Sequence, residues 1–401
     1  MKTKIALACQ GGGAQTAFTA GALKALLEAG IEEDFEIVSI GGTSGGAVCA
    51  ALIWYAMQAG EQPVWQRLME FWTESNRPQS PQEKLFNYFT VEGSRLVGRG
   101  LVPSYNVSPY NPVGKFMFQM ATATHRKTFA DFKEALKAHI DFDQIEAWGP
   151  RDKRPILVVG AAGVRSGQLR KFVSRTEVIK VEHILASCCV PNIFPAVEIG
   201  DDAYWDGLFA DNPPVFALVR PFFVGEGNVP DEIWLIKIEP TGRPTVPTEP
   251  DDIQDRRKQM EGNVALMNQL GAIKILNSIH VMGGFTPELL EKLQWTKPVR
   301  IPEVFIGDGE KQPYDIPHIE MSPELYQKID WEAKLDRSAQ NINRLIEDGR
   351  QRALEFLEKR KRVVESKPLG APPARQRAQL TPAAAKQDAV PSAKSAGRGG
   401  R

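Results

Sequence analysis

The sequence carries no net charge, few cysteines and no long apolar run. Its 401 residues include 49 Lys or Arg and 49 Asp or Glu, which gives no whole-chain argument for a nucleic-acid partner. The four cysteines lack the spacing of zinc ligands and there is no EF-hand-like acidic loop, so we expect no metal or organic cofactor. The longest apolar stretch, residues 47–57, is too short to span a bilayer. We therefore expect a soluble cytoplasmic protein with reduced cysteines and no nucleic-acid partner.

Charge is distributed unevenly along the chain. Residues 360–401 hold ten Lys or Arg and two Asp or Glu, a balance of +8, so residues 1–359 carry −8. From residue 367 onward the chain is rich in Pro, Ala, Gln, Lys and Gly, a composition typical of disorder. Such a basic tail can draw a protein to the anionic inner face of a membrane as a peripheral contact. A solvated tail that only aids solubility is the alternative.

Strand and helix patterns alternate near the start of the chain. A buried strand at residues 4–9 precedes a helix at 16–29, and a second strand at 35–40 precedes a run of helix formers at 47–59. This alternation predicts a parallel sheet with right-handed crossovers. The regularity is lost at residues 75–127, which are rich in aromatic residues, Pro and Asn, and no element is assigned there.

The chain divides into three parts by pattern and composition. Residues 1–250 read as an α/β core. Long helical patterns at 251–280 and 331–362 predict a helical C-terminal extension over residues 251–366. Residues 367–401 form the expected disordered tail.

The segment GGTSGG at residues 41–46 joins the second predicted strand to a helix. Its frame Gly42-x-Ser44-x-Gly46 fits a nucleophile elbow, in which glycines remove the Cβ atoms that would clash in so tight a turn. The turn lifts the Ser44 hydroxyl above the sheet edge, and the helix N-terminus directs N–H donors toward it. Because Gly-rich strand–helix turns also bind phosphate, the segment alone leaves a catalytic serine and a phosphate site open.

Three consecutive glycines, Gly11, Gly12 and Gly13, follow the first predicted strand. Acyl transfer by a serine needs N–H donors for the oxyanion, and a loop without side chains can turn its amides toward a neighbouring strand end. The alternative is a dinucleotide-binding turn. However, a G-x-G-x-x-G pattern counted from Gly11 requires glycine where Thr16 stands. An oxyanion loop is therefore favoured.

A catalytic serine also needs a base. Of the five histidines, His280 and His318 come late enough for the chain order Ser, acid, His, but neither lies in a Gly-flanked loop after a strand. Asp206 ends a strand-like stretch and precedes Gly207, so its carboxylate can reach a neighbouring elbow. If it is desolvated, it can take the serine proton directly. The alternative is that Asp206-Gly207 is merely a turn.

Four sequence blocks occur in the order in which they occur in the patatin-like phospholipases. They are QGGGAQ at residues 10–15, GTSGG at 42–46, AS-x3-P-x2-FP at 186–195 and DG-x3-DN-x-P at 206–214. Each block alone is weak, but together they are specific. Over about residues 3–240 the chain resembles that family.

The resemblance implies a three-layer α/β/α fold with a mostly parallel central sheet, followed here by the helical region and the tail. It also implies hydrolysis of lipid carboxylic esters, of phospholipase or lysophospholipase type, through a Ser-Asp dyad and an acyl-enzyme. Carried over by position, Ser44 is the nucleophile, Asp206 is its partner, and Gly11, Gly12 and Gly13 form the oxyanion hole. Two alternatives remain: a hydrolase or acyltransferase acting on a storage polyester or thioester, and an inactive lipid-binding scaffold.

The chain departs from the family pattern at two positions. Gln15 stands where the family usually has Arg or Lys, which leaves open how the oxyanion loop is anchored and whether activity is lowered. Leu208 follows Asp206-Gly207 where the family often has Gly or Ala. Because Asp206 and Gly207 themselves are present, the dyad remains the expectation.

Overall fold

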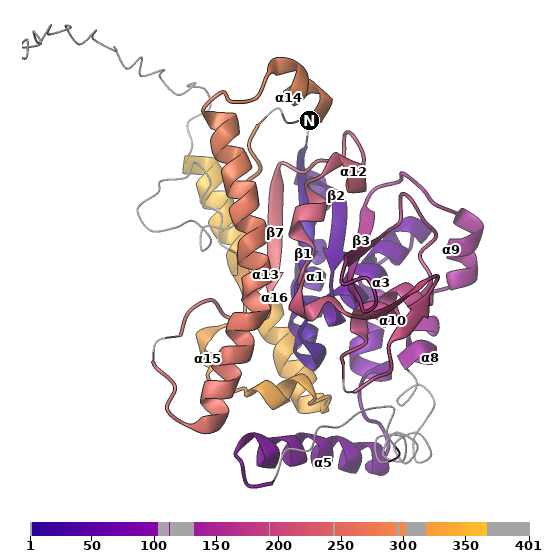
Figure 1. The fold of residues 1–401 in the computed structure, drawn as a ribbon, viewed down its shortest axis with the longest axis vertical. Helices are drawn as coiled ribbons and strands as arrows, with labels where there is room; N and C mark the ends of the chain where they lie inside the picture. Colours follow the sequence, from indigo (N-terminus) through magenta and orange to yellow (C-terminus); the bar gives the residue numbers. More distant parts are fainter. Residues whose placement is uncertain are drawn as a thin grey trace, which may run out of the picture.

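The computed structural model describes most of the chain (Figure 1). The described residues are 2–102, 112, 132–191, 193–243, 245–293, 295, 297–301 and 318–366. The expected tail at residues 367–401 therefore lies outside them. Among the described helices, none is both long and apolar enough to cross a membrane.

The strands are β1 Thr3–Cys9, β2 Phe35–Gly42, β3 Ile156–Gly163, β4 Leu169–Val173, β5 Val197–Ile199, β6 Asp202–Asp206, β7 Glu232–Lys237 and β8 Ile319–Glu320. The α-helices are α1 Ala17–Glu28, α2 Ile31–Asp34, α3 Gly45–Ala59, α4 Gln66–Glu70, α5 Pro81–Gly98, α8 Phe132–Lys137, α9 Phe142–Trp148, α10 Val181–Cys188, α11 Val215–Leu218, α12 Pro221–Val224, α13 Pro250–Val281, α14 Pro287–Leu293, α15 Pro323–Tyr326 and α16 Ala339–Ser366. Three 3₁₀ turns and one π-helical turn complete the description: η1 Gly13–Thr16, η3 Gly207–Phe209, η5 Trp331–Lys334 and η2 Phe71–Ser75.

The strands form one mixed sheet in the order β5-β6-β3-β2-β1-β7-β8, with β4 also paired to β3. Parallel pairing joins β3, β2, β1, β7 and β8. Antiparallel pairing adds β4 and β6 to β3, and β5 to β6. The mostly parallel sheet that the sequence predicts is confirmed.

Helices cover both faces of the sheet, because successive residues of a strand point to opposite sides. On one face Ile5 and Leu7 of β1 share a core with α1, α3, α10 and α16. On the other face Ala6 and Ala8 share a core with α11 and α13. The three-layer α/β/α architecture is therefore confirmed. In Figure 1 the N-terminus lies at the upper end of the sheet, so the parallel strands run downward and α5 lies below their carboxyl ends.

The C-terminal region contributes to this same sheet and core. Strand β8 pairs in parallel with β7 at the edge of the sheet. Helix α16 runs so close to α1 that a Cβ atom on Gly21 would lie 1.9 Å from the carbonyl oxygen of Ile346, and one on Gly349 would lie 2.0 Å from that of Phe18. The two glycines thus allow the helix backbones to touch, and the region expected as an extension shares its packing with residues 1–250.

The second long C-terminal helix begins later than its sequence pattern suggests. The expected helix over residues 331–362 is replaced by the short turn η5 and, after a break, by α16 from Ala339. Asp330 caps η5 by accepting the Ala333 N–H at 2.9 Å. The hydroxyl of Ser338 accepts the Asn341 N–H at 3.3 Å, and this bond starts α16. The first long helix, α13, matches the expectation closely.

A buried ion cluster fastens α16 to the sheet. The Glu232 carboxylate, on β7 and 1% exposed, accepts hydrogen bonds from Arg360 Nη2 at 2.7 Å and from Arg300 Nη1 at 2.8 Å. Its other oxygen accepts the Trp234 Nε1–H at 3.1 Å. Both carboxylate oxygens are therefore satisfied, which is the condition under which a buried charge is tolerated.

We predict that Arg360→Ala lowers the free energy of unfolding by ~3 kcal/mol, because Glu232 keeps its burial and loses one of its two cations. Urea unfolding of the full chain measures this change. The matched control is Arg257→Ala, which breaks an exposed pair with Glu261 of the same 2.7 Å length and should cost less than ~1 kcal/mol. Equal effects of the two substitutions would contradict the role assigned to the buried cluster.

Candidate active site

Ser44 occupies a sharp turn between β2 and α3. Its φ is 57°, and it is the one non-glycine residue with positive φ in the part of the chain that the structure describes. The turn leaves no space for side chains at its flanks: a Cβ atom on Gly42 would lie 2.4 Å from Gly46, and one on Gly46 would lie 2.2 Å from the Cys9 carbonyl oxygen. This backbone has the strain and geometry expected of a nucleophile elbow.

Ser187, at the end of α10, ties this turn to the sheet. Its fully buried hydroxyl accepts the Ser44 N–H at 3.0 Å and donates to the Gly160 carbonyl oxygen on β3 at 2.7 Å. The Thr43 hydroxyl makes a parallel link by donating to the Asp211 carbonyl oxygen at 2.5 Å. The position of Ser44 is therefore set by bonds on both sides of the elbow.

Asp206 ends β6, next to β3, and its side chain is fully buried. Its Oδ1 accepts the Leu208 N–H at 2.9 Å. Burial raises the pKa of Asp206 to about 7, against smaller lowering effects of the Ser44 hydroxyl, the Leu208 N–H and the Lys334 ammonium. Among the described residues no donor has hydrogen-bond geometry to Oδ2. The structure thus brings Ser44 and Asp206 together and leaves one carboxyl oxygen able to accept a proton.

The Gly-rich loop follows β1, whose last residue, Cys9, pairs with Gly42 of β2, so the loop and the elbow meet at one sheet edge. The Gly11 N–H is donated to Asn212 Oδ1 at 2.6 Å, and Asn212 Nδ2 returns a bond to the Gly11 carbonyl oxygen. Both backbone groups of Gly11 are therefore used in the hydrogen bonds that hold the loop. Gly12 and Gly13 continue the loop toward η1, and their role in binding an oxyanion remains a prediction.

Close contacts make both of these glycines necessary. A Cβ atom on Gly12 would lie 2.6 Å from Ile238 Cγ2. Gly13 has φ of 56°, and a Cβ atom there would lie 2.5 Å from the Lys334 carbonyl oxygen. A side chain at either position would therefore displace the loop.

Histidine takes no part in this arrangement within the described residues. The fifth histidine, His125, lies outside them. Of the other four, His139 hydrogen-bonds to Ser75, His183 stacks on Phe172, His280 lies edge-on to Phe285, and His318 pairs with Glu320. Burial also lowers the pKa of His183 to about 4. The geometry thus favours Asp206 as the base.

Three residues near the site were not assigned a role from the sequence. Ser187 and Asn212 belong to the blocks that carry the family resemblance, but their partners lie far away in the chain. Lys334 belongs to no block, and no sequence signal connects it to the site. Only the folded arrangement places it near Asp206 and Gly13.

A cavity of about 720 Å³ adjoins the loop. Ile238, which packs against Gly12, lines it together with Arg95, Tyr326 and Asp330, whereas Ser44 and Asp206 do not. Across the described part of the chain, no three His, Cys, Asp or Glu side chains gather as a metal site would require.

A family model described as Patatin-like phospholipase matches residues 7–219, more than half of the chain. No curated protein matches the chain. Among solved structures, VipD from Legionella pneumophila is similar at 14% identity, covering 89% of this chain and 67% of VipD, with a TM-score of 0.37. ExoU of Pseudomonas aeruginosa, solved with SpcU, is similar at 18% identity, covering 74% of this chain, with a TM-score of 0.29. The match spans 57% of the ExoU chain, less than two thirds of its length.

We predict that Ser187→Ala lowers kcat for ester hydrolysis at least tenfold, because the Ser44 N–H and the Gly160 carbonyl both lose their partner. The free energy of unfolding should fall by ~1–3 kcal/mol. Ser174→Ala is the matched control. Ser174 is a buried serine whose hydroxyl accepts the Leu157 N–H, also at 3.0 Å, and Leu157 lies on β3, the strand that holds Gly160. Its loss should cost similar stability and leave kcat unchanged. If Ser174→Ala lowered kcat equally, the effect would be one of stability alone.

We predict that Asp206→Asn stabilises the fold above pH 7. Because the folded pKa is about 7 and the ordinary value is 3.8, ionising Asp206 costs the folded state ~4 kcal/mol in full above pH 7 and nothing below pH 4. The gain from Asn should therefore grow between pH 4 and pH 7, as measured by urea midpoints. The exposed Asp201 in the same hairpin supplies the control, Asp201→Asn, which should change the free energy of unfolding by less than ~0.5 kcal/mol. A pH-independent gain would refute the assigned cause.

Proposed function

We propose, since the chain belongs to the patatin-like phospholipase family of lipid acyl hydrolases, that Ser44 and Asp206 form its catalytic dyad. The observation that carries this proposal is the pairing of a strained serine with a fully buried carboxyl group whose Oδ2 has no hydrogen-bond donor among the described residues. A carboxyl group kept out of water retains a high proton affinity, which is the property a general base needs.

In the first half of the reaction, the Ser44 Oγ attacks the ester carbonyl carbon while its proton passes to Asp206 Oδ2. The carbonyl oxygen becomes an oxyanion, and the N–H groups of Gly12 and Gly13 can stabilise it. The tetrahedral intermediate then collapses and releases the alcohol, which takes the proton back from Asp206. An acyl group remains on Ser44 Oγ.

In the second half, water attacks the acyl carbon and gives its proton to Asp206. Collapse of this second intermediate returns that proton to Ser44 Oγ and releases the fatty acid. A single carboxyl group thus serves as base and acid in turn. A pKa of about 7 suits this double use, because the group gives and takes a proton with little cost near neutral pH.

The elbow supports both halves of the reaction. Ser44 precedes α3, a 15-residue helix whose N-terminal N–H groups carry positive potential toward the developing charge. Bonds from Ser187 and Asn212 hold the elbow and the loop in place before substrate binds. Such preorganisation is the main source of oxyanion stabilisation in enzymes.

We predict that Ser44→Ala and Asp206→Asn each lower hydrolysis of a short aryl ester by ~10³-fold or more while the protein stays folded. A fluorophosphonate probe should label the unmodified chain at Ser44 and should fail to label Ser44→Ala. His280→Ala and His318→Ala should keep most of the activity, because neither side chain contacts the dyad. If either histidine substitution were as damaging as Ser44→Ala in a folded protein, a histidine triad would replace this model.

The same assay extended to phospholipids, lysophospholipids and thioesters identifies the preferred acyl donor. Lipid esters should be cleaved with higher kcat/KM than thioesters of the same chain length. Labelling of Ser44 without turnover of any of these substrates would indicate a binding scaffold instead of an enzyme.

A further inference from the structure

Helix α5 turns large apolar side chains away from the protein. Leu85, Tyr88, Phe89 and Leu96 of this helix are 56%, 58%, 62% and 41% exposed. Because an α-helix repeats every 3.6 residues, Leu85, Phe89 and Leu96 follow one another along a single stripe, with Tyr88 beside it. We call these four residues the outer face of α5. A helix on the surface of a soluble protein normally buries such a stripe and shows its polar residues to water.

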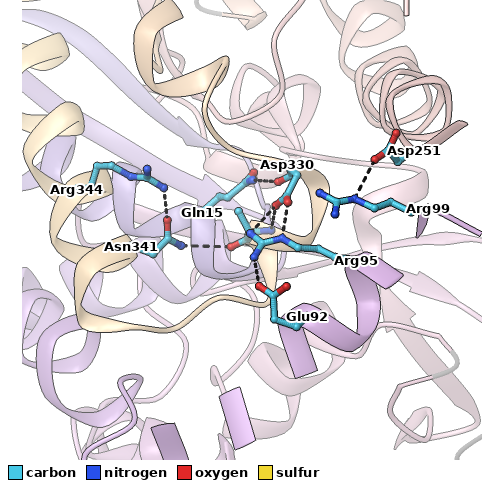
Figure 2. A network of polar contacts seen from close by, with 9 residues as sticks. Gln15, Glu92, Arg95, Arg99, Asp251, Asp330, Asn341 and Arg344 are labelled. Atoms are coloured by element: carbon cyan, nitrogen blue, oxygen red, sulfur yellow. Dashed lines mark hydrogen bonds and ion pairs between the residues drawn. The ribbon is translucent and has the colours of Figure 1, made fainter. Parts of the chain in front are cut away.

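Polar contacts attach α5 to the protein. Asn87 Nδ2 donates to Asp336 Oδ1 at 3.1 Å, and Asn87 Oδ1 accepts the Arg337 N–H at 3.0 Å. Arg95 binds both carboxylate oxygens of Asp330, with Nε to Oδ2 at 2.6 Å and Nη2 to Oδ1 at 3.3 Å (Figure 2). Bidentate Arg–carboxylate pairs fix geometry as well as charge. The attachment of α5 therefore does not depend on burying its outer face.

The same contacts lead from α5 to the proposed active site. The carbonyl oxygen of Asp330, whose carboxylate binds Arg95, accepts a hydrogen bond from Gln15 Nε2 at 3.3 Å, directly after the three glycines of the loop. The cavity of about 720 Å³ is lined by Arg99, which follows α5, and by Ile238, which packs against the loop. Figure 1 shows α5 below the carboxyl ends of the parallel strands. The helix and the site thus lie at the same end of the molecule.

The charges at the two ends of the outer face are positive. Lys84 is exposed at its start, and Arg99, whose side chain is 59% exposed, lies at its end and pairs loosely with Asp251 at 3.6 Å. The only acidic residue between them in sequence, Glu92, forms an ion pair with Arg95. Residues 84–99 therefore carry three cations and one anion, a balance of +2, within a part of the chain that carries −8. This charge is complementary to an anionic surface.

A lipid surface fits this combination of side chains. Amphipathic helices that lie in the interface of a bilayer place leucine and aromatic side chains among the acyl chains and Lys or Arg among the headgroups. A tyrosine such as Tyr88 suits the boundary, because its ring is apolar and its hydroxyl is polar. The family to which the chain belongs acts on lipids, so the substrate itself belongs to such a surface.

We propose that the outer face of α5 docks the protein on a lipid surface, with Lys84 and Arg99 against anionic headgroups. Docking brings the end of the molecule that holds Ser44 toward the lipid that carries the ester. The proposal rests on the proposed function, because hydrolysis of lipid esters is what makes this orientation useful. It differs from the attraction expected of the basic residues 367–401, because burial of apolar side chains also acts on a surface without net charge.

The test is cosedimentation of the full chain with phosphatidylcholine vesicles, prepared with and without phosphatidylserine. Leu85→Gln with Phe89→Gln removes apolar surface and keeps a good helix former at one position, so the affinity for both kinds of vesicle should fall at least tenfold. Leu85→Met with Phe89→Leu keeps the face apolar and should bind as the unmodified chain does. Lys84→Gln should weaken binding about fivefold on vesicles with phosphatidylserine and leave it unchanged on the others.

The matched control is Phe222→Gln. Phe222 is 74% exposed on α12, and α12 lies at the upper end of the sheet in Figure 1, away from α5. The substitution removes an equally exposed aromatic side chain at a place that docking through α5 leaves in water, so binding should not change. A loss of binding equal to that of the α5 double variant would overturn the proposal.

Hydrolysis separates docking from chemistry. In the Leu85→Gln, Phe89→Gln variant, turnover of vesicle phospholipid should fall with binding, whereas turnover of a soluble aryl ester should stay, because a soluble ester reaches Ser44 without docking. Unchanged vesicle binding by this variant would overturn the proposal, and a dimer of the unmodified chain that the same variant separates would then assign the face to contact between two copies. An unmodified chain that binds vesicles through α5 but shows no Ser44-dependent hydrolysis or probe labelling would overturn the proposed function instead.

Discussion

Burial of the Asp206 carboxyl group is the constraint on which the site depends. A carboxylate in water is a poor base for a serine hydroxyl, whereas one enclosed by β3, the elbow and α10 holds a proton near neutral pH. The enclosure requires three strand ends to meet closely. The glycines at positions 42, 46 and 160 allow this, because a Cβ atom on any of them would lie within 3.0 Å of the backbone or side chain of a neighbour.

The same burial makes the site costly for the fold. The strained φ of Ser44 and the Asp206 Oδ2, which has no hydrogen-bond donor in the part of the chain that the structure describes, both oppose folding, so the surrounding structure must hold them in place. It does so with bonds between segments far apart in the chain: Ser187 to Ser44, Asn212 to Gly11 and Asp211 to Thr43. Each bond joins two of the sequence blocks that identify the family. Their joint occurrence in the sequence therefore has a structural cause.

Much of the fold could be predicted from the local sequence pattern. The parts that were not predicted were missed for identifiable physical reasons. Buried strands such as β1 and β2 are short apolar runs next to Gly-rich turns, and both features are visible in the sequence. Helix α5 was missed in a mixed segment, although Ser80 and Glu83 form a capping box at its start. The break before α16 was missed because the helical pattern continues through residues 331–362. The start of α16 is marked only by the Ser338 hydroxyl, which accepts the Asn341 N–H. The elbow and the Asp-Gly strand end could be read locally, whereas Lys334 approaches Asp206 only through tertiary packing.

The C-terminal region is bound to the core by several kinds of interaction at once. Strand β8 extends the sheet, α16 touches the backbone of α1, and Arg360 neutralises Glu232 beneath β7. The contact of η5 with the Gly-rich loop is a fourth link, and it lies at the site itself. Because these links share α16 and the residues just before it, a displacement of that helix would reach the loop through Asn341 and η5. The Gly-rich loop is therefore held from two distant parts of the chain: Gly11 by Asn212, and Gln15, at the position where a basic side chain is usual in the family, by the Asp330 carbonyl oxygen.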